Sequence, residues 1–553
     1  MKASFVRRKF NRMLAVATMT MSVNYIVMLS GSVIVGNLVG GEGLAGVNAC
    51  TPAFGAVSFI ASILSVGTAM VFSRAMGAFD ERRAAGVFSQ SLAFAAAAGA
   101  AVFAAMQLGG EAYLDFTGVT GGVREQAAHY WKWLSVAMGL LPAVLLMEAL
   151  VYADGDVAVA AAAGAVHVAG AVGLSTLFTA VSGDAGGASA GSALIMAAVL
   201  AVCCAHFLRR DNHLKWRPRF NLRDLGEICA LSLADSTIYL CWGALMLVVN
   251  KFTVVRFGQT PLPVVAMAAS VVEFSIVFDG VGEAIIPIGG MYDGEGNRPA
   301  LRELARHSAV TATLEGLVCG AAFFALAPLL APLYGIRGDA APLLPEAVRM
   351  TRAISCAMPF MGLLMMANTH FLVVHRVPFA VSVTVVKDFL FPCAGVLILG
   401  GAFGIGGIWL GFAAGYAAAA AYPFVYVRLR HGADMFPWLI GRDDGRSADF
   451  TLRMTPGAAE SAAVRAADFL RRAGVPAAVA GRVAAVVGDS GRLAAARNEK
   501  PPLVEYFIAA EKDGARLVVR DDGRRAEPAC ETDAGGRYLN TLGCNRVEYR
   551  FPI

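Results

Sequence analysis

The sequence is poor in charged residues. Of its 553 residues only 16% are Asp, Glu, Lys or Arg, whereas 57% are hydrophobic, and the mean hydropathy is +0.60. Soluble domains carry about 25% charged residues, so this composition excludes an ordinary globular protein. A C-x-x-C pair is also lacking, since the ten cysteines are scattered apart from the adjacent Cys203 and Cys204. We therefore expect the cysteines to be packing residues and expect no metal site.

Long apolar runs are what the sequence has instead. About 20 apolar residues in a helix cross the hydrocarbon core of a bilayer. Twelve such segments can be counted in the first 430 residues, six on each side of a basic loop around residues 209–223. Their approximate spans are 13–39, 48–73, 87–109, 127–152, 156–182, 186–208, 225–254, 262–290, 307–334, 345–374, 378–403 and 406–429. We predict an all-α polytopic membrane protein with twelve transmembrane helices.

The basic residues predict the orientation of these segments. They gather at the N-terminus and in the loops after the second, sixth and eighth segments, as in Arg74, Arg209 and Arg298. Since loops rich in Lys and Arg stay on the cytoplasmic side, both termini are expected to be cytoplasmic. The net charge of +5 follows from the same loops and gives no reason to expect nucleic acid as a partner. High Ala, Gly and Arg usage favours a bacterial inner membrane.

One pattern occurs twice in the chain. The series Gly67, Gly77, Phe79 and Asp80 recurs at one fixed offset, and each copy closes an apolar segment and opens a charged loop. The second copy consists of Gly280, Gly290, Tyr292 and Asp293. Internal repeats of this kind are typical of secondary transporters, whose substrate site lies between the two copies. We predict two pseudo-symmetric six-helix lobes, over residues 1–215 and 216–436.

Charged residues inside the apolar segments are candidate functional residues, because burying a charge at mid-bilayer is costly. Most lie in the second half, and the first half contributes only Glu148, near the end of a segment. Asp279 and Glu283 are four residues apart and share a helix face, whereas Glu273 lies roughly opposite. A salt bridge with a nearby Lys or Arg is the alternative role. The candidates for the coupling ion or the substrate are Asp235, Glu273, Asp279, Glu283, Asp388 and His370.

The membrane part of the chain resembles the multidrug and toxic compound extrusion (MATE) transporters. The similarity lies in V-G-N-L-V-G-G-E-G-L-A from Val35, in the run S-V-G-T-A-M-V-F-S-R-A-M-G-A-F-D, and in its second copy G-V-G-E-A-I-I-P-I-G-G-M-Y-D. Residues 153–156 stand where the family often has R-G-x-G-D. The resemblance covers residues 13–430 and implies a V-shaped pair of lobes that exports amphipathic, often cationic, molecules in exchange for H⁺ or Na⁺.

Two carboxylates of the family pattern have no counterpart in this chain. The family's first-helix aspartate corresponds to Gly31, with Ser30 and Ser32 beside it, and the tenth segment offers Asn368, Thr369 and His370 but no acid. We therefore expect either that coupling has moved to Asp235, Glu273 and Asp279 or that ion coupling is weak.

After Pro437 the chain becomes polar, and residues 437–447 are predicted to link the lobes to a small cytoplasmic α+β domain over residues 448–553. The expected elements are strands at 450–454, 503–509, 516–520 and 546–551 and helices at 458–472, 476–497 and 536–542. Asp513-Gly514 between two apolar runs indicates a hairpin.

This order, with V-V-R-D-D-G at residues 518–523, resembles the Bergerat-type ATPase fold of anti-sigma-factor kinases. The resemblance implies that Asp521 or Asp522 with Gly523 would read adenine and that Gly535 and Gly536 would be a remnant lid. The helix at 476–497 lacks the Glu and Asn that hold magnesium and phosphate in that family, and Arg525 replaces its second glycine. We therefore expect a degenerate domain that binds a protein partner or only weakly a nucleotide, and no resident cofactor.

Together these features predict a membrane transporter, not an enzyme, that exports small molecules by cation antiport with alternating access. A flippase for a lipid-linked precursor is an alternative, with a basic cavity built from Lys132, Lys251, Arg256, Arg349, Arg352 and Lys387. A transporter-like receptor that signals through its C-terminal domain is another. The expected partners are membrane lipid, the substrate and a protein bound by the C-terminal domain.

Overall fold

The computed structural model describes residues 4–39, 41–117, 120–209, 212–258, 261–333, 342–441, 445–525 and 536–553. The first six predicted segments are six long helices, which we call the first half. They are α1 (Phe5–Leu38), α2 (Gly41–Gly77), α3 (Glu81–Thr117), α4 (Gly121–Ala153), α5 (Val157–Ser182) and α6 (Gly186–Cys204), and α6 ends in the 3-10 turn η1 (Ala205–Leu208).

The other six predicted segments form the second half, in which several spans are interrupted. Proline at the start of α11, α12, α13 and α14 accounts for part of this, because proline favours the first turn of a helix and breaks a preceding one. The elements are α7 (Leu222–Phe257), α8 (Leu262–Glu273), η2 (Phe274–Phe278), α9 (Asp279–Glu295), α10 (Arg298–Leu333), α11 (Leu344–Ser355), α12 (Met358–Val373), α13 (Val377–Val385), η4 (Val386–Leu390), α14 (Phe391–Phe403) and α15 (Ile405–Met435).

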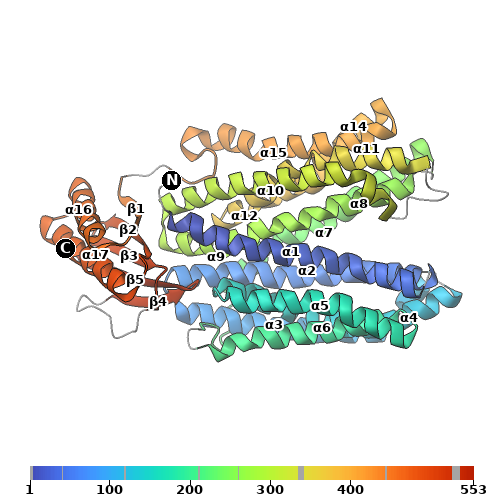
Figure 1. The fold of residues 1–553 in the computed structure, drawn as a ribbon, viewed down its shortest axis with the longest axis horizontal. Helices are drawn as coiled ribbons and strands as arrows, with labels where there is room; N and C mark the ends of the chain where they lie inside the picture. Colours follow the sequence, from blue (N-terminus) through green and yellow to red (C-terminus); the bar gives the residue numbers. More distant parts are fainter. Residues whose placement is uncertain are drawn as a thin grey trace.

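Nine helical spans of the described residues are long and apolar enough to cross a membrane, with α6–η1 and α13–η4–α14 each counted as one, and α11 with α12, bent by 42°, makes a tenth span. The remaining two predicted segments coincide with α1 and with the run α8–η2–α9. The sequence-based prediction of a polytopic all-α membrane protein is therefore confirmed. Figure 1 shows α3–α6 on one side of α1 and α2, and α10, α11, α14 and α15 on the other.

The repeated glycines lie where the two halves meet. A Cβ on Gly77 of α2 would lie 2.7 Å from the carbonyl oxygen of Met291 in α9. A Cβ on Gly280 of α9 would lie 2.7 Å from the backbone nitrogen of Thr18 in α1. Because these neighbours are backbone atoms, only a residue without a side chain allows the helices this close.

The C-terminal part of the chain, residues 447–553, forms a small sheet domain that we call the tail. Its elements are β1 (Ser447–Arg453), α16 (Pro456–Arg472), α17 (Ala477–Arg497), β2 (Leu503–Glu511), β3 (Gly514–Asp521), β4 (Arg537–Thr541) and β5 (Cys544–Pro552). The five strands are antiparallel in the order β1-β2-β3-β5-β4. Apolar side chains such as Tyr506, Ile508, Leu517 and Val519 pack one sheet face against α16 and α17.

One predicted element of the tail is wrong. Residues 536–542 were expected to be a short helix, but residues 537–541 are strand β4. Thr541 pairs with Cys544, and the two residues between them, Leu542 and Gly543, have φ of 54° and 65°. Two consecutive positive φ angles are what a two-residue hairpin turn needs, so this segment folds back on β5 instead of coiling. The predicted hairpin is present between β2 and β3, but its turn residues are Lys512 and Asp513, and Gly514 is the first residue of β3.

The sheet face away from α16 and α17 lies against one end of the helix bundle, which we call the tail side (Figure 1). The ends of α2 and α9 meet the sheet there, and Arg546 of β5 donates to the carbonyl oxygens of Met76 and Gly77. The β4–β5 turn also reaches the first half, because a Cβ on Gly155 in the α4–α5 loop would touch the backbone of Leu542.

The close approach of α9 to α1 gives a first prediction. Gly280→Ala should lower the thermal unfolding midpoint in detergent, since overpacking against backbone costs about 1–3 kcal/mol. Gly55→Ala is the matched control within a helix, because a Cβ there would meet no atom within 4 Å. Equal midpoints for the two variants would contradict the close contact between α1 and α9.

Candidate functional site

A cavity of about 220 Å³ lies between the two halves. The first half contributes residues of α1, α2, α4 and α5, and the second half contributes residues of α7, η2, α9 and α12. Hydroxyl groups and carboxyl groups supply its polar surface. They belong to Thr20, Ser62, Ser65, Glu148, Tyr152, Tyr239, Asp279, Glu283 and Thr369.

Two of the predicted acidic residues line this cavity. Asp279 is the first residue of α9, and Glu283 follows one turn later, so both side chains lie on the same helix face. Asp279 also lines a small neighbouring cavity together with Asn368, Thr384 and Lys387. The acidic face of α9 is thus directed at the space between the two halves.

Glu148 is a cavity residue that the sequence-based candidates left out. It lies on α4 and therefore brings a carboxyl group of the first half to the same space as Glu283. The two carboxyl groups are near enough to interact electrostatically. The available signal was that Glu148 is the only acidic residue in the apolar segments of the first half apart from Asp156, the first residue of the fifth segment.

One neighbour of Glu148 ties α4 to α1. Tyr152 of α4 donates a hydrogen bond of 2.9 Å to the carbonyl oxygen of Met13. This bond anchors the helix that carries Glu148 beside the first helix of the chain.

The other predicted candidates lie elsewhere in the second half. Glu273 accepts a hydrogen bond of 3.3 Å from the indole of Trp242. Asp388 pairs with Lys387 at 2.6 Å within the π-helical turn η4. His370 contacts the carbonyl oxygen of Trp438 through Nε2 at 2.9 Å. The side chain of Asp235, in α7, lies outside the described residues.

On the tail side of this cavity, charged residues join the two halves. Arg74 of α2 donates to the carbonyl oxygens of Leu372 and Val373 at 3.1 and 2.9 Å. It also pairs with Glu227 of α7 at 3.3 Å and with Asp293 of α9 at 3.5 Å. Every one of these partners belongs to the second half, so Arg74 holds the halves together at this end.

Arg83, at the start of α3, makes a second bridge of the same kind. Its guanidinium pairs with Asp224 at 2.8 Å and with Glu227 at 2.7 Å, both near the start of α7. The bridges of Arg74 and Arg83 join the two halves between the cavity and the tail. We call the two arginines and their acidic partners the tail-side gate.

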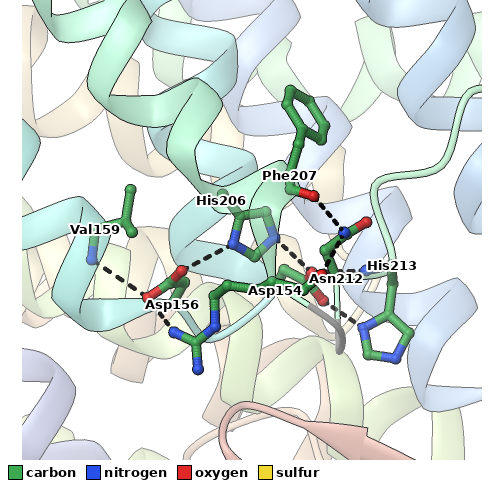
Figure 2. A network of polar contacts seen from close by, with 8 residues as sticks. Asp154, Asp156, Val159, His206, Phe207, Asn212 and His213 are labelled. Carbon is green, nitrogen blue, oxygen red and sulfur yellow. Dashed lines mark hydrogen bonds and ion pairs between the residues drawn. The ribbon is translucent and has the colours of Figure 1, made fainter.

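A further polar network fixes the connector between the halves (Figure 2). Both ring nitrogens of His206 lie 2.9 Å from a carboxylate, Nε2 from Asp154 and Nδ1 from Asp156. A ring that faces two carboxylates must donate from both nitrogens, so it carries a positive charge. Burial alone would raise the pKa of Asp154, but hydrogen bonds from His206 and His213 outweigh it and lower this pKa.

This network explains the two aspartates at the position of the family's R-G-x-G-D motif. Asp156 caps α5 by accepting from the backbone nitrogen of Val159, and it pairs with Arg209 of the connector at 2.6 Å. Asp154 accepts from the backbone and the ring of His213 at 2.9 and 2.7 Å. The α4–α5 loop therefore holds the segment that links α6 to α7 near its start, at His206, Arg209 and His213.

The residues predicted to bind nucleotide are engaged in contacts within the protein. Asp521 accepts from Asn545 and from the backbone of Gly523, and it pairs with Arg497 at 2.9 Å. Asp522 accepts from the backbone of Leu503 and pairs with Arg8 of α1 at 2.7 Å. Gly536 packs against Tyr549, and Gly535 lies outside the described residues. Nucleotide binding by the tail stays a prediction.

Two repeated helical halves around a polar cavity define a membrane transporter. The model of the MatE family matches residues 17–174 and again residues 237–390, once in each half, as the internal repeat predicts. The chain belongs to the MatE family of transporters. No protein of assigned function matches the sequence closely enough to count as a relative.

Solved structures of the family have the same fold. A MATE transporter in complex with MaL6 is 21% identical, with a TM-score of 0.72 over 77% of this chain and 96% of that one. An outward-facing multidrug resistance MATE transporter of the MOP superfamily is 20% identical, with a TM-score of 0.72 over 77% and 96%. A MOP superfamily transporter from Pyrococcus furiosus, described as having a binding pocket of reverse polarity, is 20% identical, with a TM-score of 0.71 over 78% and 98%.

The connector network gives a second prediction. His206→Ala should destabilise the protein by about 3–5 kcal/mol, because it leaves two buried carboxylates without their shared cation. The thermal unfolding midpoint at neutral pH measures the loss. His129→Ala is the control, since His129 and its partner Asp184 are both partly exposed and such pairs contribute about 0–1 kcal/mol. A His206 variant as stable as the control would show that the network does not hold the connector.

Proposed function

We propose that this protein is a secondary active exporter of cationic or amphipathic small molecules and that H⁺ or Na⁺ entering through it drives the export. The observation that supports this most is the charge of the central cavity. Its lining includes Glu148, Asp279 and Glu283, and no Lys, Arg or His occurs among its described lining residues. A cavity with only carboxylates attracts cations and repels anions.

The carboxylates come from both halves, which suits an antiport mechanism. Two like charges in one cavity repel each other unless a proton, a metal cation or a cationic substrate lies between them. A coupling cation and a cationic substrate would therefore compete for one site. Each would favour the arrangement of the halves in which it binds best, which is the basis of alternating access.

Glu148 can take the place of a carboxylate that the MATE pattern has and this chain lacks. The first-helix aspartate of the MATE pattern corresponds to Gly31. In the proposed mechanism α4 provides the carboxylate of the first half instead, and Asp279 with Glu283 provides that of the second half. The site is thus shared between the repeats.

The tail side is the cytoplasmic side in this proposal. The basic loops that predict orientation, around Arg74, Arg209 and Arg298, lie at the end of the bundle that carries both termini and the tail (Figure 1). The membrane would be the inner membrane of a bacterium, with its lipids around the apolar helix faces.

The flippase alternative finds less support. A lipid-linked pyrophosphate would need cations in the cavity, but Lys387 lines only the small neighbouring cavity and is paired with Asp388. The side chain of Lys251 lies outside the described residues. The central cavity therefore fits a cation better than a polyanion.

Export assays in inverted vesicles test the proposal. Ethidium and norfloxacin are the probes, under separate proton and sodium gradients. Glu148→Gln, Asp279→Asn and Glu283→Gln should each reduce gradient-driven export roughly tenfold or more, because each removes a charge that the cation or the substrate needs.

Glu111→Gln is the matched control, since Glu111 lies in an exposed ion pair with Arg124 at the end of α3. Glu273→Gln tests the competing candidate on α8. If Glu273→Gln abolishes export while the three cavity variants remain active, the coupling site lies outside the cavity. A wild-type protein that exports neither probe under either gradient would overturn antiport of these compounds.

A further inference from the structure

The sheet face that meets the bundle carries charges where a small domain would normally be apolar. Strand register places Glu505 of β2 opposite Arg520 of β3, and Arg520 opposite Arg546 of β5. These three side chains are at most 1% exposed. Two arginines directly opposite each other repel, so this row is stable only with carboxylates against it.

A carboxylate of the bundle supplies this charge. The side chain of Glu295, the last residue of α9, pairs with Arg520 through one oxygen and with Arg546 through the other, the latter at 2.6 Å. The carbonyl oxygen of Glu295 also accepts from Arg516 of β3 at 2.5 Å. The second half of the transporter is thus bound by three arginines of the tail.

The first half is bound by the same face. Arg546 donates to the carbonyl oxygens of Met76 and Gly77 at 2.9 and 2.6 Å, where α2 ends. Arg537 of β4 donates to the carbonyl oxygen of Phe79 at 2.8 Å. Arg546 therefore contacts α2 of the first half and Glu295 of the second half at the same time.

The aromatic residues of the repeat give the tail nearly symmetric contacts with the two halves. Phe79 and Tyr292 occupy the same position in the two copies of the repeat. The guanidinium of Arg546 lies over the Phe79 ring at 3.7 Å from its centroid, and that of Arg520 lies over the Tyr292 ring at 4.7 Å. Each copy of the repeat offers an aromatic face, and one tail arginine stacks on each.

Because Arg520 and Arg546 are buried charges, their contacts with the bundle depend on the distance between the two halves. Burial lowers the pKa of Arg546 to about 9 and that of Arg520 to about 10, so both remain charged at neutral pH. If the ends of α2 and α9 moved apart while the tail stayed bound, Arg546 would lose either its carbonyl partners or Glu295. A buried charge without its partner is strongly unfavourable.

We propose that the tail is a conformational lock, which binds both repeats only when the tail-side gate is closed and must leave at least one of them before that end of the bundle can open. This goes beyond the proposed transport activity, because it assigns the tail a role in the opening equilibrium. Arg74 and Arg83 close the gate directly beneath the sheet, so the tail and the gate stabilise the same arrangement.

Hydrogen exchange of the full-length protein in nanodiscs, read by mass spectrometry, tests the lock without substrate or gradient. The wild type is compared with Arg546→Ala at neutral pH. Two sets of peptides are followed. Residues 76–79 and 292–296 contact the tail, and residues 224–232 of α7 contain the gate residues Asp224 and Glu227 and make no tail contact among the described residues. Breaking the lock should speed exchange roughly tenfold or more in both sets.

Three further variants make the result interpretable. Arg524→Ala is the control, since Arg524 forms an exposed pair with Glu499 within the tail and should leave exchange unchanged. Arg546→Lys should give an intermediate effect, because an ammonium cannot reproduce the fork of the guanidinium. Arg537→Ala removes one contact to the first half and replaces Arg546→Ala if that variant does not fold.

The gate peptide decides between a lock and a local cap. Faster exchange at residues 76–79 and 292–296 with unchanged exchange at 224–232 would mean that the tail covers the two loops without affecting the gate, and it would overturn the lock. Unchanged exchange in both sets would overturn it as well. Because exchange does not depend on export, this outcome is separate from the outcome of the vesicle assays.

Discussion

The carboxylate of Glu295 is the interaction on which the tail side of this protein depends. It lies at the last residue of α9, is buried, and pairs with two arginines that would otherwise repel each other across adjacent strands. Without it, Arg520 and Arg546 would be buried cations with insufficient partners, and the sheet could not keep this face against the bundle. This acidic side chain is therefore a central contact between the tail and the helix bundle.

Charged residues are scarce in the membrane part of this chain, and those between the halves gather at two sites, the central cavity and the tail side. The carboxylates of the central cavity are directed at the space between the halves, whereas the arginines of the gate and of the tail connect the halves at one end. Between these sites the halves approach each other through glycine, as at Gly77 and Gly280. Glycine contacts allow close approach with little directional strength, so the charged contacts at the end of the bundle decide how firmly the halves are held.

Much of the fold could be predicted from the sequence, because hydropathy and the repeat are local signals. The twelve apolar segments and most tail elements coincide with helices and strands of the structure. Strand β4 was missed because its turn, Leu542-Gly543, lacks the Asn or Asp that usually marks such a hairpin.

The candidate site could be predicted only in part. The spacing of Asp279 and Glu283 places them on one face of a helix, but no local pattern shows that Glu148 faces the same cavity from α4. The docking of the tail could not be predicted at all. Alternation of charged and apolar residues along β5 is typical of a sheet with one face in water, whereas β2 is apolar around Glu505. Only the three-dimensional arrangement shows that the charged face is buried against Glu295.

The position of the tail in the chain has a consequence for biosynthesis. The arginines that join the two repeats lie after every described membrane helix in the chain, so they leave the ribosome later than those helices. Both halves are therefore inserted in the membrane and free to find each other before the segment that binds them exists. A protein truncated before β5 would contain every membrane helix and the cavity, yet it would lack the piece that completes the assembly.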